Sequence, residues 1–242
     1  MLPLHDENPR RGTPWVTYAL LLANVLVFAH QITLPASLVE THLTRWGVVP
    51  CELLGALRHL GAPGSLPEVA TLLTSMFLHG GWLHIGGNML FLYIFGDNIE
   101  DELGPGRYLT FYVGCGVLAS LAQVAAGPAS TVPTVGASGA VSGVLGAYMV
   151  LHPTARIVTL LFLGFFITRA RIPAFLFLGL WFGLQAVQGL AALSTHQAAA
   201  GGGVAWFAHL GGFAAGVLVA LGVRSARHHR APRWGRGGRS GR

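Results

Sequence analysis

Long apolar runs alternate with short polar segments along the chain, and the runs have the length of membrane-spanning helices. A helix needs about 20 mostly apolar residues to cross the hydrocarbon core of a bilayer. The runs that meet or approach this length are residues 15–34, 82–99, 109–126, 137–151, 172–193 and 204–223. Pro14 precedes the first run and Pro35 follows it, as expected at helix boundaries. The pattern predicts an all-α membrane protein with six transmembrane helices.

Two segments do not fit this scheme. Residues 35–79 mix charged, apolar, Gly and Pro positions, so we expect a long structured loop there. Residues 157–167 are apolar and bracketed by arginines, but eleven residues are too few to span a bilayer as a helix. We expect an interfacial or re-entrant segment at this position. A seventh span is the less favoured alternative.

Composition supports a membrane protein and excludes two other classes. The chain is 52% hydrophobic and only 10% charged, whereas soluble domains carry about 25% charged residues. A soluble globular enzyme and a disordered protein are therefore both disfavoured. The formal net charge is +6, which is compatible with either nucleic acid or an anionic membrane surface as a partner.

The distribution of arginine decides between these partners and predicts the topology. All fifteen basic residues are Arg, and with six spans thirteen of them fall on the side of the two termini. Because arginine-rich short loops stay in the cytoplasm, both termini are predicted to be cytoplasmic. Residues 1–14 are then a cytoplasmic N-terminal segment without a removable signal peptide, and residues 15–223 are the membrane domain. Residues 224–242 are an Arg-rich tail, which we expect to be disordered and to contact anionic lipid rather than nucleic acid.

Several polar side chains fall within the predicted spans, where such groups are costly and need a reason. They are Ser138, His84, Asn88 and His209, and His79 lies just ahead of the second span. The predicted topology places the four residues within the spans in the outer third of the bilayer. At about 1.5 Å per residue, His209 lies roughly 7 Å and Asn88 roughly 9 Å below the outer surface. Their agreement in depth suggests that they meet.

Glycines at a spacing of four indicate how two of these helices could approach each other. Gly139 and Gly143 follow Ser138, and Gly212 and Gly216 follow His209. Small residues at this spacing allow helix backbones to pack closely in lipid. A serine has a short side chain, so it can reach a histidine on another helix only if the two backbones are close.

The residue types are those of nucleophilic catalysis. A serine hydroxyl needs a neighbouring base to become a nucleophile, and histidine is the usual base. Ser138 and His209 are the candidates, with no acid in the outer half of any span to complete a triad. His84, Asn88 and the Ser138 backbone N–H could stabilise an oxyanion. Taken singly, each residue also has a purely structural interpretation, as a back-bonded serine or a packed histidine.

Three motifs resemble those of the rhomboid intramembrane serine proteases, in order and over nearly the full chain. FLHGGWLHIGGNMLFLYIFG (residues 77–96) resembles the family's His-x4-His-x3-Asn helix, and GASG (136–139) resembles its nucleophile motif. AHLGGFAAG (208–216) resembles its Ala-His-x2-Gly-x3-Gly helix. The acidic turn at 100–104 and the N-terminal PLHDENPRR are also similar to those of members, the latter to bacterial ones.

The resemblance implies a six-helix rhomboid bundle in the bacterial cytoplasmic membrane, with a water-filled cavity open to the outer face. It implies cleavage of peptide bonds in or near the transmembrane helices of membrane-protein substrates, without metal or cofactor. Ser138 would be the nucleophile, His209 the base, and His84, Asn88 and the Ser138 amide the oxyanion site. His79 would support the cavity. The oligomeric state is not indicated.

The chain also departs from the family, and other functions stay open. Members often carry an aromatic residue one turn after the nucleophile, stacked on the catalytic histidine, where this chain has Ser142. Some carry a Trp-Arg pair in the first outer loop, where this chain has the reverse order, Arg45-Trp46. One alternative is an inactive relative that binds transmembrane helices. Another is a metal or proton transporter built on the three histidines, which the lack of Cys or carboxylate partners at that depth disfavours.

Overall fold

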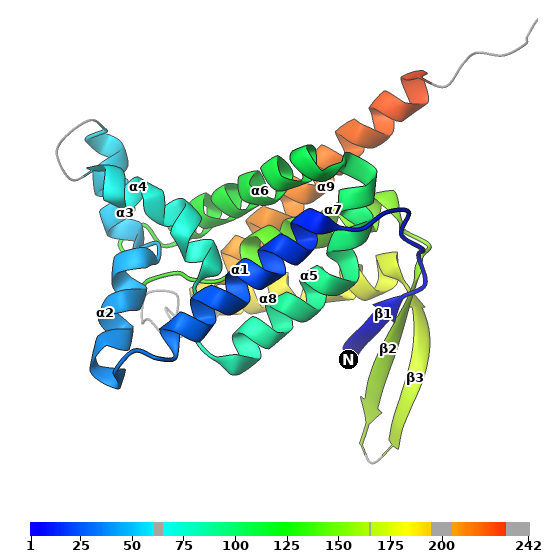
Figure 1. Ribbon diagram of the computed structural model, residues 1–242, viewed down its shortest axis with the longest axis horizontal. Coiled ribbons are helices and arrows are strands. Elements are labelled where there is room, and N and C mark those ends of the chain that lie inside the picture. Colours follow the sequence, from blue (N-terminus) through cyan, green and yellow to red (C-terminus); the bar gives the residue numbers. More distant parts are fainter. Residues whose placement is uncertain (61–64, 165, 195–204, 231–242) are drawn as a thin grey trace, which may run out of the picture.

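The structure, a computed structural model, is a helical bundle with a small sheet at one end (Figure 1). It describes residues 1–60, 65–164, 166–194 and 205–230. The helices at the predicted apolar runs are α1 (Trp15–Gln31), α5 (Trp82–Leu103), α6 (Pro105–Ala126), α7 (Ser138–Leu151), α8 (Ala174–Ser194) and α9 (Trp206–Arg230). α9 continues seven residues into the predicted tail, whose remainder lies outside the described residues.

Three of these helices are long and apolar enough to cross a membrane by length and composition. The qualifying stretches are Pro105–Ala126, Ala174–Ala191 and Trp206–Ala226. α1 and α7 are apolar but shorter, at 17 and 14 residues, and α5 ends in an acidic cluster. The count of six spans and the cytoplasmic termini therefore stay predictions.

The expected long loop between the first two spans is wrong, because most of that segment is helical. It contains α2 (Ala36–Trp46), α3 (Pro50–Arg58), α4 (Ser65–Thr74) and a 3-10 turn, η1 (Ser75–Phe77). Pro50 occupies the first turn of α3, where its missing N–H costs nothing. Val48, Leu53 and Leu72 of this segment form a small apolar cluster with Val124 of α6. The segment thus packs on the bundle at the end opposite the sheet (Figure 1).

The expected interfacial segment is a β-hairpin, so a seventh helical span does not occur there. β2 (Arg156–Leu163) and β3 (Phe166–Pro173) pair antiparallel, with Gly164 in the turn at φ 62°. β1 (Leu2–Asp6), a strand that we did not predict, pairs antiparallel with β2 and gives the order β1-β2-β3. Short apolar runs rich in β-branched residues form strands as readily as helix segments. The structure therefore has a sheet that an all-α prediction lacks.

A buried carboxylate ties α1 to the last turn of α5. The Glu100 carboxylate accepts hydrogen bonds from the backbone N–H groups of Val16 and Thr17, at 3.0 and 2.8 Å. These are first-turn N–H groups with no partner inside their helix, and they favour a negative charge. α5 then ends at Gly104, whose φ of 78° is unfavourable for other residues. This arrangement fixes the sheet end of the bundle.

α7 lies in the centre of the bundle and packs closest against α9. Residues 139–148 of α7 are all buried. A Cβ built on Gly212 would lie 2.0 Å from the Gly139 carbonyl oxygen, and one on Gly216 would lie 1.9 Å from that of Gly143. Any side chain at these positions would force the helices apart. The glycines therefore bring the backbone that follows Ser138 against the backbone that follows His209.

Candidate active site

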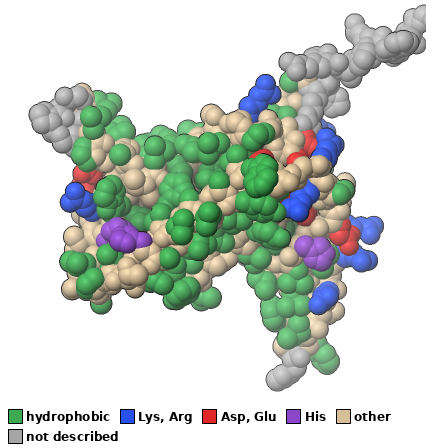
Figure 2. Space-filling model, viewed as in Figure 1, with side chains coloured by type: hydrophobic (Ala, Val, Ile, Leu, Met, Phe, Trp, Pro, Cys, Tyr) green, Lys and Arg blue, Asp and Glu red, His purple; other side chains and the backbone are tan. Residues whose placement is uncertain are grey.

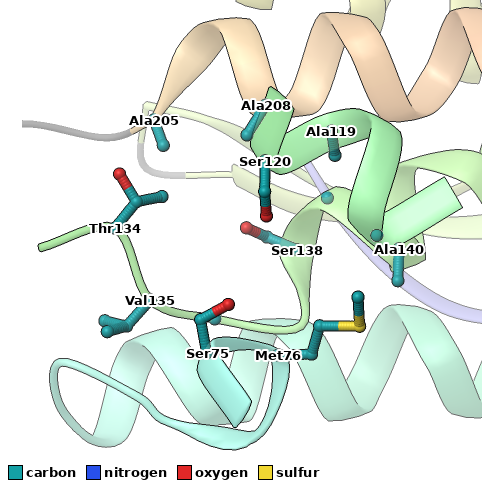
Figure 3. A pocket seen from close by; sticks show the side chains of 13 residues that line it. Ser75, Met76, Ala119, Ser120, Thr134, Val135, Ser138, Ala140, Ala205 and Ala208 are labelled. Carbon is teal, nitrogen blue, oxygen red and sulfur yellow. The ribbon is translucent and has the colours of Figure 1, made fainter. Parts of the chain in front are cut away.

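Ser138 is the first residue of α7 and is accessible from a small pocket (Figure 3). In Figure 3 its hydroxyl projects into the pocket and faces the hydroxyl of Ser120 from α6. The pocket lies between α6, α7, the start of α9 and the segment before α7, and small side chains dominate its lining. Its lining residues are Ser75, Met76, Gly116, Ala119, Ser120, Thr134, Val135, Gly136, Ser138, Gly139, Ala140, Ala205 and Ala208.

The position of Ser138 at a helix N-terminus places backbone donors beside its hydroxyl. The first N–H groups of an α-helix have no acceptor within the helix, and they carry the positive end of its dipole. One turn later, the Ser142 hydroxyl donates to the Ser138 carbonyl oxygen at 2.6 Å. Ser142 is therefore engaged with its own helix and does not orient another side chain.

His209 is buried on α9, 8% exposed, and is held by a glutamine of α8. Its Nδ1 lies 2.6 Å from Oε1 of Gln185. Because an amide oxygen can only accept, the ring donates Nδ1–H in this bond. A neutral imidazole has one N–H, so Nε2 of His209 is left with a free lone pair.

Two tryptophans pack around the same imidazole. The Trp181 ring lies 5.9 Å from that of His209, centroid to centroid, at an interplanar angle of 37°. The Trp206 ring lies 6.2 Å away and meets it edge-on, at 88°. Aromatic contact with this histidine thus comes from α8 and from the preceding turn of α9, not from position 142.

His84, in the first turn of α5, has the opposite arrangement of its ring nitrogens. The backbone N–H of Gly80 donates to His84 Nδ1 at 3.2 Å. A backbone N–H can only donate, so Nδ1 is the unprotonated nitrogen and the neutral ring carries its proton on Nε2. His84 Nε2–H is therefore a donor.

Gly136 allows this donor to approach the serine. A Cβ built on Gly136 would lie 2.6 Å from His84 Nε2 and 3.6 Å from Ser138 Oγ. Gly136 also has a φ of 123°, a conformation that side-chain-bearing residues rarely adopt. His84 Nε2 and Ser138 Oγ therefore both lie near one point that only a glycine leaves open.

Asn88 and His79 complete the α5 side of the site. Asn88 is one turn beyond His84 on the same face and 7% exposed, and its Nδ2 donates to no atom of the described residues. The His79 ring is buried and meets the His84 ring edge-on, with centroids 5.2 Å apart. Gln31 of α1 bonds both the N–H and the carbonyl of His79, at 3.1 and 2.7 Å. The His79 ring, whose backbone is held by Gln31, thus supports the position of the His84 ring.

The structure brings the predicted residues to one end of the bundle, but it does not show every contact expected between them. Ser138 and His209 lie on the two most closely packed helices, next to the contact between Gly139 and Gly212. In the described part of the chain, no hydrogen bond joins the Ser138 hydroxyl to His209. Catalytic hydrogen bonds are often long in structures without substrate.

Several residues of this site are not among the predicted ones, including Gln185, Trp181, Trp206 and Gly136. Gln185 carried a usable signal, because an amide inside an apolar run is as much in need of a reason as a histidine. Its relation to His209 depends on how α8 packs on α9, which no spacing within either run reveals. From the sequence, Gly136 is recognisable only as a member of the GASG motif.

Comparisons with known proteins agree with this architecture. The family model described as "Rhomboid domain" matches residues 66–226. Rhomboid protein 1, mitochondrial, of Saccharomyces cerevisiae is 31% identical over 68% of this chain and 46% of its own length. Rhomboid protease GluP of Bacillus subtilis is 33% identical over 58% of this chain and 25% of its own. RHOMBOID-like protein 5 of Arabidopsis thaliana is 38% identical over 59% of this chain and 53% of its own. The chain thus spans about half or less of the length of these relatives.

Proposed function

The chain belongs to the rhomboid family, and on that premise we propose that this membrane protein is a serine endopeptidase. It hydrolyses peptide bonds in or next to transmembrane helices of membrane-protein substrates. Six spans (residues 15–223) cross the bilayer, both termini lie in the cytoplasm, and the Ser138 end of the bundle opens to the outer side. One relative carries the name of a rhomboid protease.

The observation that carries the proposal is the opposite placement of protons on two histidines. The Gln185 bond leaves His209 Nε2 as a base. The Gly80 bond leaves His84 Nε2–H as a donor, next to the same Gly136 position that Ser138 Oγ approaches. A base and a hydrogen-bond donor around one serine are the two requirements for attack on a carbonyl group.

In the first half of the reaction, Ser138 Oγ attacks the scissile carbonyl carbon while His209 Nε2 takes the hydroxyl proton. The negative charge moves to the carbonyl oxygen, which accepts hydrogen bonds from the Ser138 N–H and His84 Nε2–H. Asn88 Nδ2, which has no other acceptor among the described residues, is the third donor. The tetrahedral intermediate then collapses, and His209 returns its proton to the leaving amine.

In the second half, water hydrolyses the ester formed on Ser138. His209 Nε2 takes a proton from the water, whose oxygen attacks the acyl carbon. Collapse of this second intermediate releases the new carboxyl group and returns the proton to Ser138. The cycle uses the chain's own side chains and needs no metal ion or cofactor.

The narrow pocket favours an unwound substrate with small residues. Inside a helix, each carbonyl is shielded by its backbone hydrogen bond, which is costly to break in lipid. A substrate helix with glycine or other weak helix formers near its outer end could unwind into the site. The pocket beside Ser138 is small, although serine, glycine and alanine make up most of its lining.

A fluorophosphonate probe tests the proposal on the detergent-purified protein. The wild type should be labelled, because an activated serine attacks the probe's phosphorus. Ser138→Ala should abolish labelling, and His209→Ala should reduce it by about 10²-fold or more. Ser142→Ala is the matched control, because it removes a hydroxyl from the same helix, and it should be labelled like the wild type.

Absence of labelling in a folded wild-type protein would contradict the proposal. The same histidines and glycines would then belong to a catalytically inactive relative that binds transmembrane helices. Labelling that persists in Ser138→Ala would instead show that the wrong serine has been assigned.

A further inference from the structure

The hairpin formed by β2 and β3 projects sideways from the bundle (Figure 1), and it follows the end of α7 opposite to the one that Ser138 begins. Near its tip, Phe162, Phe166 and Ile167 are 55%, 77% and 63% exposed. Figure 2 shows the same feature as an apolar protrusion with basic side chains nearer the bundle. If water surrounded the hairpin, this apolar surface would be exposed. Exposed apolar patches usually mark a surface that contacts a protein or a membrane.

The hairpin is joined directly to a helix that is a candidate membrane span. β3 ends at Pro173 and α8, a candidate span, begins at Ala174. The Ala174 N–H also donates to the Ala155 carbonyl oxygen at 2.8 Å, which fixes the base of the hairpin on the start of that span. The sheet therefore ends within one residue of a candidate span, whichever side of the membrane this end faces.

Along the hairpin, apolar side chains near the tip are followed by charged side chains nearer the bundle, which is the sequence of environments found across a membrane interface. Ile167, Arg169 and Arg171 alternate along β3 and so share one face of the sheet, together with Phe162, the cross-strand partner of Ile167. The apolar pair lies toward the tip and the arginines lie toward the bundle. Arg171 bonds Glu7 at 2.7 Å, whereas Arg169 is exposed and makes no ion pair within the described residues.

We propose that this hairpin is a membrane-interface anchor that inserts its apolar tip beside the lipid headgroups and binds anionic phosphate through Arg169. β3 is an edge strand, and its unpaired backbone groups could not be satisfied in hydrocarbon. The tip therefore lies at the level of the headgroups and upper acyl chains. The arginines along β3 also disfavour pairing of this edge with a second copy of the chain.

An environment-sensitive fluorophore on the hairpin tests the anchor in proteoliposomes. The labelled variant is Ile167→Cys and the control is Thr154→Cys, an exposed position at the base of the hairpin. Both carry Cys51→Ser, and the remaining Cys115 is buried. In vesicles of phosphatidylcholine and phosphatidylglycerol, the tip probe should be quenched about threefold less by aqueous iodide than the control. Lipids spin-labelled near the headgroup should quench the tip probe preferentially. Phe162→Cys should repeat this result from the facing strand.

Arg169→Gln tests the charged half of the proposal. With the tip probe, spin-labelled phosphatidylglycerol should quench more than spin-labelled phosphatidylcholine, and Arg169→Gln should reduce this preference by roughly fivefold, the effect of one arginine at an anionic surface. Equal quenching by both lipids in the unsubstituted hairpin would overturn the anionic-lipid assignment.

Two other results would overturn the anchor itself. Iodide quenching of the tip probe equal to that of the control would place the hairpin in water. If the protection of the tip probe from iodide disappears as the protein-to-lipid ratio is lowered, the apolar tip contacts a second copy of the chain instead of lipid. Fluorophosphonate labelling of the same samples keeps this result separate from the proposed catalysis, because the hairpin variants should retain wild-type labelling.

Discussion

Gln185 Oε1 lies 2.6 Å from Nδ1 of His209, and this bond joins α8 to the proposed base on α9. It has the role that an aspartate has in a serine–histidine–aspartate triad, since it fixes the tautomer and the orientation of the ring. An amide does so without placing a charge in the membrane. It also explains how His209 can be oriented although Ser142 is engaged with the Ser138 carbonyl.

Gln185→Leu should slow fluorophosphonate labelling by about 10- to 100-fold, because the imidazole loses the acceptor that fixes Nδ1–H. Gln185→Glu keeps an acceptor at the same distance and should restore most of the rate. The measurement is the second-order rate constant of labelling for each variant. Equal rates for Gln185→Leu and the wild type, with unchanged thermal unfolding, would show that the bond does not position His209.

Gly136→Ala should abolish labelling while leaving the protein folded. The new methyl group would lie 2.6 Å from His84 Nε2, and the backbone there has a φ of 123°. Gly127→Ala is the matched control, because its Cβ would lie 3.9 Å from the nearest atom, Ser130 Cβ. Full labelling of the Gly136 variant would mean that His84 does not approach the serine through this gap.

Gly212→Ala should destabilise the bundle by about 1–3 kcal/mol, because its Cβ would overlap the Gly139 carbonyl oxygen at 2.0 Å. Gly222→Ala, on the same helix, meets nothing within 4 Å and should leave stability unchanged or slightly higher. Thermal unfolding in detergent measures both. A similar unfolding temperature for the two variants would argue against close packing of α7 on α9.

The docking of β1 should weaken as pH rises through about 6. Burial, with a smaller contribution from the nearby Asp97 carboxylate, raises the pKa of Asp6 from 3.8 to about 6, against a lowering by the hydrogen bond from Tyr148. A raised carboxyl pKa means that the docked strand binds the proton more tightly than the free strand does. The stabilisation is therefore greatest below pH 4 and is lost between about pH 4 and 6.

Hydrogen exchange of residues 2–6 measures this effect. Exchange should be slower at pH 5 than at pH 7.5 after correction for the intrinsic pH dependence, and Asp6→Asn should remove the difference. A difference of the same size in Asp6→Asn would assign the titration to another group.

The sequence was most informative where lipid constrains it and least informative at the two ends of the bundle. The apolar runs predicted the helices because a span must be long and apolar, and His84, Asn88 and His209 stood out because polar groups are rare there. Residues 157–167 were ambiguous, since a short apolar run fits a strand or a helix segment. β1 became recognisable only through its partner strand, which is distant in sequence.

The polar contacts between helices were also beyond sequence reasoning. Gln185 and His209 are 24 residues apart on separate helices, and Gln31 braces His79 across 48 residues. Such pairs depend on the rotation of each helix in the bundle. Once that rotation is known, each pair follows from ordinary hydrogen-bond chemistry.

The most direct test of the central claim is to identify the oxygen atom that reacts with a fluorophosphonate. Ser138 and Ser120 face each other in the same pocket (Figure 3), so peptide mapping of the labelled protein by mass spectrometry distinguishes them. We predict a single adduct on Ser138 that does not form in His209→Ala. An adduct on Ser120, or none on the folded wild type, would contradict the assignment of Ser138 as an activated nucleophile.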